Sequence, residues 1–279
     1  MEGLCKDFTD RRKRMKRNGL TLEEIGWGDA KAIKVTGSHH GIYFRNRNPE
    51  INLSTPIFRY MKLGHLISLV DNKSLYIPNR SAFTDLRDKM GFEKISLENI
   101  RSSGLEVAES YKNMKEIRAW REYKDKAFHV CISCWTTDRR GPDTVDENFL
   151  MWKAYSASND ITCRVKTTIK DLVDSIEDLS CDIAVSDVFY NEGGNRYDRL
   201  IFGKSIYYES EQEIRVVALS NDNHVDVKIN PYSLIKEIKT SPFVIPPVEG
   251  SIIDMLKKRY PQLENVISSS KVMEYAYVN

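Results

Sequence analysis

A dense run of charged residues in the C-terminal half has the residue types and spacing needed for acid–base or electrostatic chemistry. It contains Lys204, Glu209, Glu211, Glu213 and Arg215. If the run enters a β-strand, the period of two places the three glutamates and Arg215 on one face. Carboxylates this close repel one another and need cationic partners, and one of them could act as a base or stabilise a developing cation. The alternative is a salt-bridged edge strand that faces solvent.

A second candidate is Arg59, which lies between Phe58 and Tyr60 in the β-prone residues 55–60. A guanidinium group can form two parallel hydrogen bonds to a phosphate or a carboxylate. Arg59 therefore suits the capture of a phosphate. It also suits a structural ion pair with one of the glutamates, and the two roles are compatible.

Residues 149–155 predict a helix that carries Trp152 and Tyr155 three positions apart. Asp146 or Asn148 could cap its first turn, since short polar side chains accept hydrogen bonds from the free backbone N–H groups there. A helix with such aromatic residues packs into a core more often than it forms a shelf for a ligand. Both roles stay open for Trp152.

One pair of cysteines has a spacing found in metal sites, and one pair of histidines is adjacent in the chain. Cys131 and Cys134 are separated by two residues, but a zinc site needs about four ligands and usually a second close pair. Cys163, Cys181 and His129 do not form such a pair. The alternation around residues 128–135 predicts a strand with its two cysteines on opposite faces, so we expect buried cysteines and no metal. The adjacent pair His39 and His40 is expected in a surface loop.

The overall composition limits the classes of protein that the chain can belong to. Apolar residues make up 41% and charged residues 29%, which is typical of a globular domain. The net charge is +2, so any contact with nucleic acid must come from a local patch. Residues 1–25 contain a basic run, interpreted as a solvated arm or helix rather than a phosphate-binding arm. No stretch predicts a membrane span or a secretory signal, and five cysteines favour a reducing cytoplasm.

The patterns along the chain favour a single α+β domain over residues 1–279. We expect a split mixed or antiparallel sheet, with helices mostly in the N-terminal half and strands mostly in the second half. The predicted helices cover residues 62–71, 81–125 with breaks, 149–155, 172–179 and 250–260. The predicted strands cover residues 55–60, 74–77, 128–135, 161–168, 182–190, 200–208, 213–219 and 224–230.

Several of these motifs, taken in order, resemble a large bacterial family of unknown function. The resemblance covers residues 55–220 and rests on an aromatic-Arg-Tyr strand, a Met-Trp-x-x-Tyr helix and a Glu-x-Glu-x-Arg strand. The matching stretches are residues 58–60, 74–85, 131–135, 147–155, 165–168, 188–190 and 204–215. The pattern of that family in turn resembles divergent ADP-ribosyltransferases, including the type found in DNA-targeting toxins.

The resemblance implies a sheet that grips NAD as a substrate, and it assigns roles to residues by position. Arg59, with Tyr60 beside it, would anchor the dinucleotide, and Tyr76 or Ser81 would follow the second strand. Glu211 or Glu213 would stabilise the ribose cation as nicotinamide leaves, because a fixed carboxylate favours positive charge where it develops. The remaining residues expected to contact NAD are Trp152, Lys204 and Arg215.

Two other functions remain compatible with the sequence. The first is a binding or sensor module without catalysis, which would contact nucleic acid through the basic N-terminal run or through Arg139 and Arg140. The second is a nuclease that uses Asp85, residues 209–213 and magnesium. Under the transferase hypothesis the protein is a toxin or an anti-phage effector. Its partners would be NAD and a nucleic-acid or protein acceptor, and no membrane.

Overall fold

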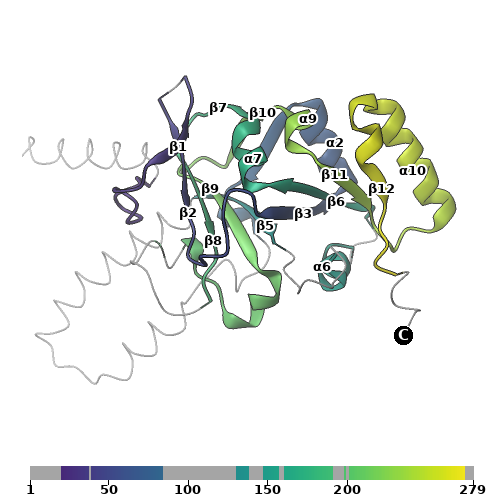
Figure 1. The fold of residues 1–279 in the computed structure, drawn as a ribbon, viewed down its shortest axis with the longest axis horizontal. Coiled ribbons are helices and arrows are strands. Elements are labelled where there is room, and N and C mark those ends of the chain that lie inside the picture. The colour runs from purple at the N-terminus through teal and green to yellow at the C-terminus, as the bar shows by residue number, and fades with distance from the viewer. Residues whose placement is uncertain are drawn as a thin grey trace, which may run out of the picture.

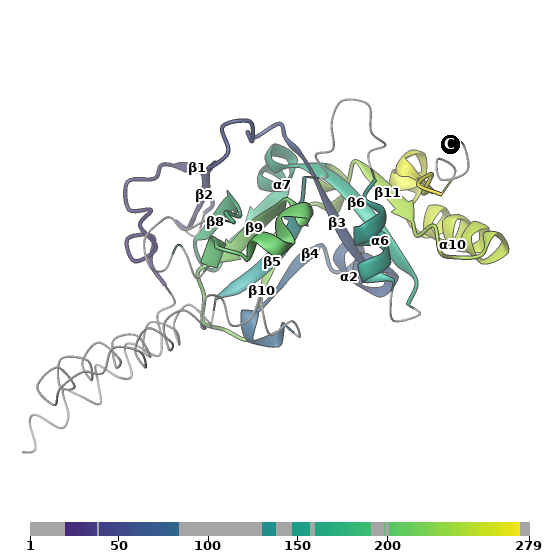
Figure 2. The ribbon, with the colours of Figure 1, turned by 90° about the horizontal axis from the view of Figure 1, so that it is seen from below.

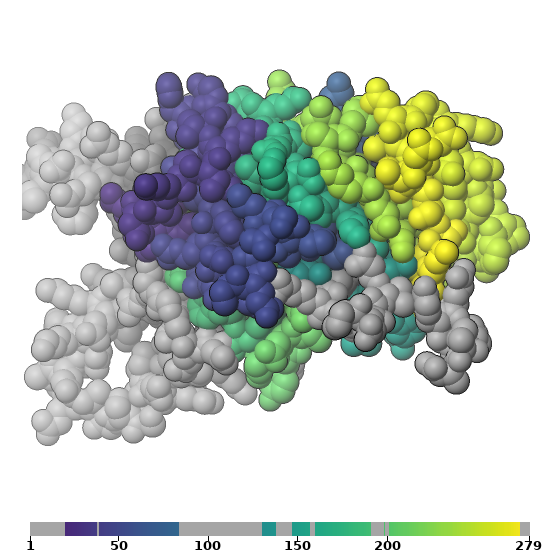
Figure 3. Space-filling model, in the orientation of Figure 1, coloured from purple at the N-terminus to yellow at the C-terminus, as the bar shows by residue number. Residues whose placement is uncertain are grey.

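The protein is a mixed α/β structure built around one large sheet. A computed structural model describes residues 20–37, 39–83, 130–137, 147–156, 160–190, 198 and 201–273 (Figure 1). The first strands and the last helix lie at opposite ends of this structure, purple and yellow in Figure 3. No helix in the described ranges is long and apolar enough to cross a bilayer.

The large sheet has nine strands, and their order in space differs from their order in the chain. Neighbouring strands are antiparallel except for β2 with β8 and β11 with β12, which are parallel. Across the sheet the order is β1 (Ala32–Val35), β2 (Gly41–Arg45), β8 (Ile183–Asp187), β9 (Glu213–Ala218), β5 (Cys131–Thr136), β3 (Pro56–Lys62), β6 (Thr162–Thr168), β11 (Glu237–Thr240) and β12 (Ile267–Ser269). A second sheet joins β4 (Ser74–Pro78), β10 (His224–Ile229) and β7 (Ile176–Asp178).

Helices cover both faces of the large sheet. Figure 1 shows α2, α7 and α9 above the sheet, α6 below it, and α10 beside the last strand. The α-helices are α2 (Leu63–Asp71), α6 (Phe149–Tyr155), α7 (Ile169–Ser175), α9 (Pro231–Leu234) and α10 (Pro246–Arg259). The 3₁₀ helices are η1 (Arg80–Ala82), η2 (Ile206–Glu211) and η3 (Pro261–Val266).

The main core lies between the sheet and the helices α2, α7, α9 and α10. Alternation along the strands sends apolar side chains to this side, such as Ile214 and Val216 of β9, where they meet Leu66 of α2 and Leu172 of α7. Each fully buried aliphatic side chain of this kind contributes about 1.5–3 kcal/mol to stability. The other face of β9 carries Glu213 and Arg215, followed by Val217 of a second apolar cluster, so the strand is buried on both sides and polar at one end of this face.

The sheet is weakly joined between β3 and β5. Strand β3 pairs with β6 along its whole length, from Pro56 opposite Thr168 to Lys62 opposite Thr162. Among the described residues its register with β5 consists of one pair, Phe58 opposite Thr136. We call this joint the β3–β5 seam. It divides the nine strands into two parts that each have a continuous ladder, and it lies beside the candidate site.

Most predicted elements in the described ranges are confirmed. The strands at residues 55–60, 74–77, 213–219 and 224–230 and the helix at 62–71 all form. Asn148 caps α6, since its side chain accepts hydrogen bonds from the backbone N–H groups of Leu150 and Met151. The predicted helices at 81–125, the basic residues 1–19 and the loop with Arg139 and Arg140 lie outside the described residues.

Two structural predictions need correction. Residues 200–208 do not form a strand, because Gly203 makes only an isolated bridge to Phe189 and η2 begins at Ile206. The helix predicted at 172–179 starts earlier, at Ile169, where the Thr168 side chain caps it. It ends at Ser175 because the next residues pair with β10. The expected concentration of helices in the first half stays a prediction, because most of residues 81–125 lie outside the described residues.

Candidate functional site

The centre of the candidate site is a buried ion pair on β9. Arg215 donates from Nε to Oε1 of Glu213 over 2.7 Å and from Nη2 to Oε2 over 3.4 Å. Its Nη1 donates to the backbone carbonyl of Ile201. Both side chains are almost completely buried. Two charges this close in a low-dielectric interior are tolerated because each compensates the other and the hydrogen bonds are made.

Lys204 joins this pair to a second carboxylate. Its Nζ lies 2.9 Å from Oε2 of Glu213 and 2.7 Å from Oε2 of Glu211. The ammonium group also lies 4.7 Å from the centre of the Tyr208 ring, in a cation–π contact. The side chain is only 7% exposed. The glutamates were expected to need cationic partners, and Lys204 is one of them; its expected contact with NAD stays a prediction.

Glu211 reaches Lys204 from a turn rather than from the strand. It is the last residue of η2, and Gln212 after it adopts the left-handed conformation with φ 44°. The Thr136 hydroxyl donates to the backbone carbonyl of Glu211 over 2.6 Å, which fixes the turn against β5. The prediction that Glu209, Glu211 and Glu213 share one strand face is therefore wrong. Glu213 and Arg215 do share it.

The surroundings of Glu213 keep its carboxylate charged. Burial alone would raise its pKa, but the charges of Arg215 and Lys204 and a hydrogen bond from the Cys134 thiol lower the pKa to about 2. The backbone N–H of Glu213 donates to the Tyr190 hydroxyl over 3.1 Å. Desolvation raises the pKa of Tyr190 to about 12, so it stays neutral beside the carboxylate.

Arg59 lies on β3, on the other side of the β3–β5 seam, and it differs from Lys204 because its guanidinium group lies beside Trp135, a residue of the main core. Its guanidinium group lies 5.8 Å from the centre of the Trp135 ring. It makes no hydrogen bond or ion pair with any residue that the structure describes. Burial lowers its pKa, and the nearby Tyr155 and Cys134 partly offset that effect. A desolvated guanidinium without a counter-ion favours the binding of an anion.

Tyr155 connects the two sides of the seam. Figure 2 shows its helix, α6, and the green turn of η2 over the same side of the sheet. Burial and then the neighbouring Cys134 raise the pKa of Tyr155 to about 12, with Glu213 and Glu211 adding to the effect and Arg59 opposing it. The phenol, 40% exposed, is therefore within electrostatic range of the arginine and of both glutamates.

Tyr60 and Trp152 lie in the packing beneath α6. Their rings meet edge to face at 4.9 Å, and Trp152 is fully buried. Trp152 Nε1 donates to Glu147 over 3.0 Å, and the Tyr60 hydroxyl accepts from the backbone N–H of Asn148 over 3.0 Å. Burial alone would raise the pKa of Glu147, but hydrogen bonds from Lys239 and its other partners lower it. Trp152 and Tyr60 thus support the site from the core and do not present an open face.

Tyr76 and Ser81 are not brought together with the other candidates. Tyr76 lies on β4 of the small sheet, is 52% exposed, and stacks on His224 with ring centres 5.1 Å apart. Ser81 belongs to η1, and its backbone N–H donates to the side chain of Asn79. No described contact joins either residue to Arg59 or to the glutamates.

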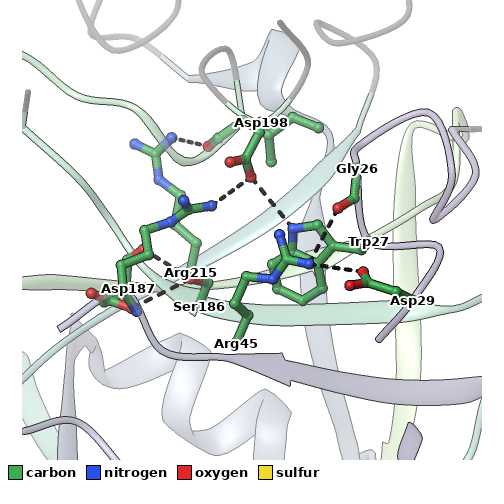
Figure 4. A network of polar contacts seen from close by, with 10 residues as sticks. Gly26, Trp27, Asp29, Arg45, Ser186, Asp187, Asp198 and Arg215 are labelled. Atoms are coloured by element: carbon green, nitrogen blue, oxygen red, sulfur yellow. Dashed lines mark hydrogen bonds and ion pairs between the residues drawn. The ribbon is translucent and has the colours of Figure 1, made fainter. Parts of the chain in front are cut away.

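A buried polar network that the sequence did not indicate supports the segment before Lys204 (Figure 4). Asp198 accepts from Trp27 Nε1 over 3.4 Å and pairs with the guanidinium of Arg47. The ring of Phe202 stacks on Trp27 with centres 5.4 Å apart and lies 5.7 Å from the Arg47 guanidinium. These contacts fix residues 201–204 and so place Lys204 between its glutamates. No short-range pattern marks them, because the partners are more than 100 residues apart.

The described residues contain no group of three His, Cys, Asp or Glu side chains that could hold a metal ion. The strand predicted around Cys131 and Cys134 is β5, with Cys131 buried on the main-core side and Cys134 toward Arg215. Asp85, named in the nuclease hypothesis, lies outside the described residues. His39, predicted in a surface loop with His40, is exposed with φ 67°.

Comparisons with known proteins leave the family open. No protein-family model matches the sequence, and no curated protein does. Among solved structures, a complex described as DarT from Thermus sp. 2.9 with ADP-ribosylated single-stranded DNA aligns with a TM-score of 0.33 and 10% sequence identity. The alignment covers 76% of this chain and 91% of that chain. This similarity is too low to establish a common fold.

Proposed function

We propose that this protein is an ADP-ribosyltransferase-like enzyme that takes NAD as its substrate. One observation carries the proposal. An arginine without a counter-ion among the described residues, Arg59, lies across the β3–β5 seam from the carboxylates of Glu211 and Glu213, with Tyr155 within electrostatic range of all three. NAD needs a cation for its pyrophosphate and a carboxylate near its nicotinamide ribose, and the two are here on neighbouring parts of one sheet.

The reaction proposed for the site is the displacement of nicotinamide from the ribose. The bond between C1′ and the nicotinamide nitrogen breaks, and its electron pair leaves with neutral nicotinamide. Positive charge then develops on the ribose, and a nearby carboxylate lowers the energy of that state. A nucleophile of the acceptor donates a lone pair to C1′ and releases its proton. Water as the acceptor would make the same chemistry an NAD hydrolysis.

The acceptor and the biological role follow the same proposal. A nucleic acid or a protein would supply the nucleophile, and the enzyme would act as a toxin or as an effector against phage. The protein would work in the bacterial cytoplasm, where NAD is present. The acceptor, the biological role and the location are proposed from the resemblance of the sequence motifs. The arrangement of Arg59 and the two glutamates supports the NAD chemistry.

The test is the release of nicotinamide from NAD by the purified full chain, without added metal, in the presence and absence of DNA, RNA and cell lysate. We expect release that is lost when Glu211 and Glu213 are both replaced by Gln. The control is Glu264→Gln, which changes an exposed glutamate on another 3₁₀ helix. Unchanged release by the double variant would refute the proposal. No release by the folded wild type under any condition would favour the binding-module alternative.

A further inference from the structure

The two glutamates of the site are held in different ways, although they are two residues apart. The side chain of Glu213 is 2% exposed, and that of Glu211 is 30% exposed. A substrate that approaches from solvent can therefore reach the carboxylate of Glu211 without moving the protein. It can reach the carboxylate of Glu213 only if the buried ion pair with Arg215 opens, which is unfavourable because it leaves buried charge uncompensated.

The hydrogen-bonding capacity of Glu213 is also largely used. Both of its oxygens accept from Arg215, Oε2 accepts from Lys204, and the Cys134 thiol adds a further hydrogen bond. A carboxylate has about four lone-pair positions, so little capacity remains for a ribose. Its negative charge is already balanced by two cations. Such a group has little capacity left to stabilise a new positive charge.

The two glutamates are linked through Lys204. The ammonium group bridges Oε2 of Glu213 and Oε2 of Glu211, and Glu213 is itself fixed by Arg215 on β9. The position of Glu211 thus depends on a chain of contacts that starts in the sheet. The backbone of Glu211 is fixed separately, by the hydroxyl of Thr136.

From these contacts we propose that Glu211 is the catalytic carboxylate and that Glu213 is a positioning residue, which orients Glu211 through Lys204. The inference rests on the proposed function, because it divides the roles within the same site. Figure 3 shows the light-green part of the chain, which includes η2, at the lower surface of the molecule. Glu211 would face the ribose from this surface, and the buried pair behind it would hold it in place.

Carboxylate labelling tests the accessibility without requiring activity. Wild-type protein is treated with a carbodiimide and an amine, and modified glutamates are located by mass spectrometry. We expect modification of Glu211 and protection of Glu213, with the exposed Glu264 as an internal reference. An NAD analogue that cannot be cleaved should protect Glu211 and leave Glu264 unchanged. Equal labelling of both site glutamates, or no protection by the analogue, would overturn the assignment.

Steady-state kinetics of NAD cleavage then separate the two roles. Glu211→Gln should lower kcat about 10²–10³-fold with little change in KM, as expected for a group that acts mainly in the transition state. Lys204→Gln should lower kcat less than Glu211→Gln does, and it should increase the labelling of Glu211. Lys204→Arg should bring both kcat and the labelling part of the way back to the wild-type values. A purely structural role for Lys204 would not alter the labelling of Glu211 in a folded variant.

The outcomes distinguish this inference from the proposed function. If Glu211→Gln keeps the wild-type kcat while Glu213→Gln loses it with an unchanged fold, the roles are reversed and the inference is wrong. In that case the transferase proposal survives. If the wild type neither cleaves NAD nor is protected by the analogue, the proposed function fails, and the catalytic role of Glu211 fails with it.

Discussion

Replacement of Lys204 by Met should be far more costly to stability than the same change at Lys62. Both lysines form close ion pairs, with Nζ 2.9 Å from Glu213 and 2.7 Å from Glu211 in one case and 2.6 Å from Asp160 in the other. They differ in burial, because Lys204 is 7% exposed and Lys62 is 52% exposed. The comparison therefore isolates the effect of the environment on one type of interaction.

The expected magnitudes follow from that difference. Removal of one partner from a buried ion pair leaves uncompensated charge and costs about 3–5 kcal/mol. Arg215 still compensates Glu213 after the change, so we expect the lower end, about 3 kcal/mol, for Lys204→Met. An exposed pair contributes about 0–1 kcal/mol, so Lys62→Met should lose at most about 1 kcal/mol. Met keeps much of the aliphatic length of Lys, so lost packing contributes little to either value.

Urea unfolding at pH 7, followed by circular dichroism, measures both variants. With a slope of about 3 kcal/mol per molar urea, the Lys204 variant should unfold about 1 M earlier than the wild type. The Lys62 variant should shift by at most about a third of that. Equal shifts for the two variants would refute the argument that burial sets the value of the Lys204 contacts. A change in the slope would show that the unfolding is not comparable between the proteins.

Three further predictions concern the rest of the site. Arg59→Gln should raise the KM for NAD at least about tenfold without loss of stability. Arg59→Lys should recover only part of the affinity, because an ammonium group lacks the forked geometry of a guanidinium group. Steady-state kinetics measure the KM, and a thermal scan measures the stability. Asn148→Ala should destabilise the protein by about 1 kcal/mol through loss of the α6 cap, whereas Asn148→Asp should be close to neutral in urea unfolding. The depressed pKa of Glu213 contributes stability that is complete above its ordinary pKa, 4.5, and is lost as the pH falls toward 2. This pH-dependent contribution to stability is on the order of 3 kcal/mol. As the pH is lowered from 4.5 toward 2, the urea midpoint of Glu213→Gln should therefore fall less steeply than that of the wild type.

Local patterns in the sequence were sufficient for the elements that carry the site. The alternation of apolar and polar residues in residues 213–219 predicted β9, and the Asn148 cap with the aromatic residues after it predicted α6. These features depend on neighbours in the chain, so they can be derived without knowledge of the fold. The same holds for the pairing of Glu213 with Arg215, which follows from the period of two.

Longer-range features could not be predicted in the same way. Residues 200–208 have strand-like side chains, but their conformation is decided by Trp27 and Arg47, which lie far away in the chain. Glu211, which was expected on the strand face of Glu213, lies instead at the end of η2. Likewise, the sequence offered both Lys204 and Arg59 as partners for the glutamates. It could not show that Lys204 contacts two glutamates while Arg59 has no counter-ion among the described residues, because that depends on how the strands pack.

Because the β3–β5 seam has so few hydrogen bonds, we expect the two parts of the large sheet to open as separate hydrogen-bonded units. Within each unit the strands pair over several consecutive residues, whereas the described residues of the seam contain one pair, Phe58 and Thr136. Amide hydrogens should accordingly exchange with deuterium in two blocks, because cooperative opening follows contiguous hydrogen-bonded units. Arg59 belongs to one of these units and Glu213 to the other. A relative movement of the two units would therefore change the distance between the guanidinium group and the carboxylate. A dinucleotide bound across the seam would link the two units and slow the hydrogen–deuterium exchange of both.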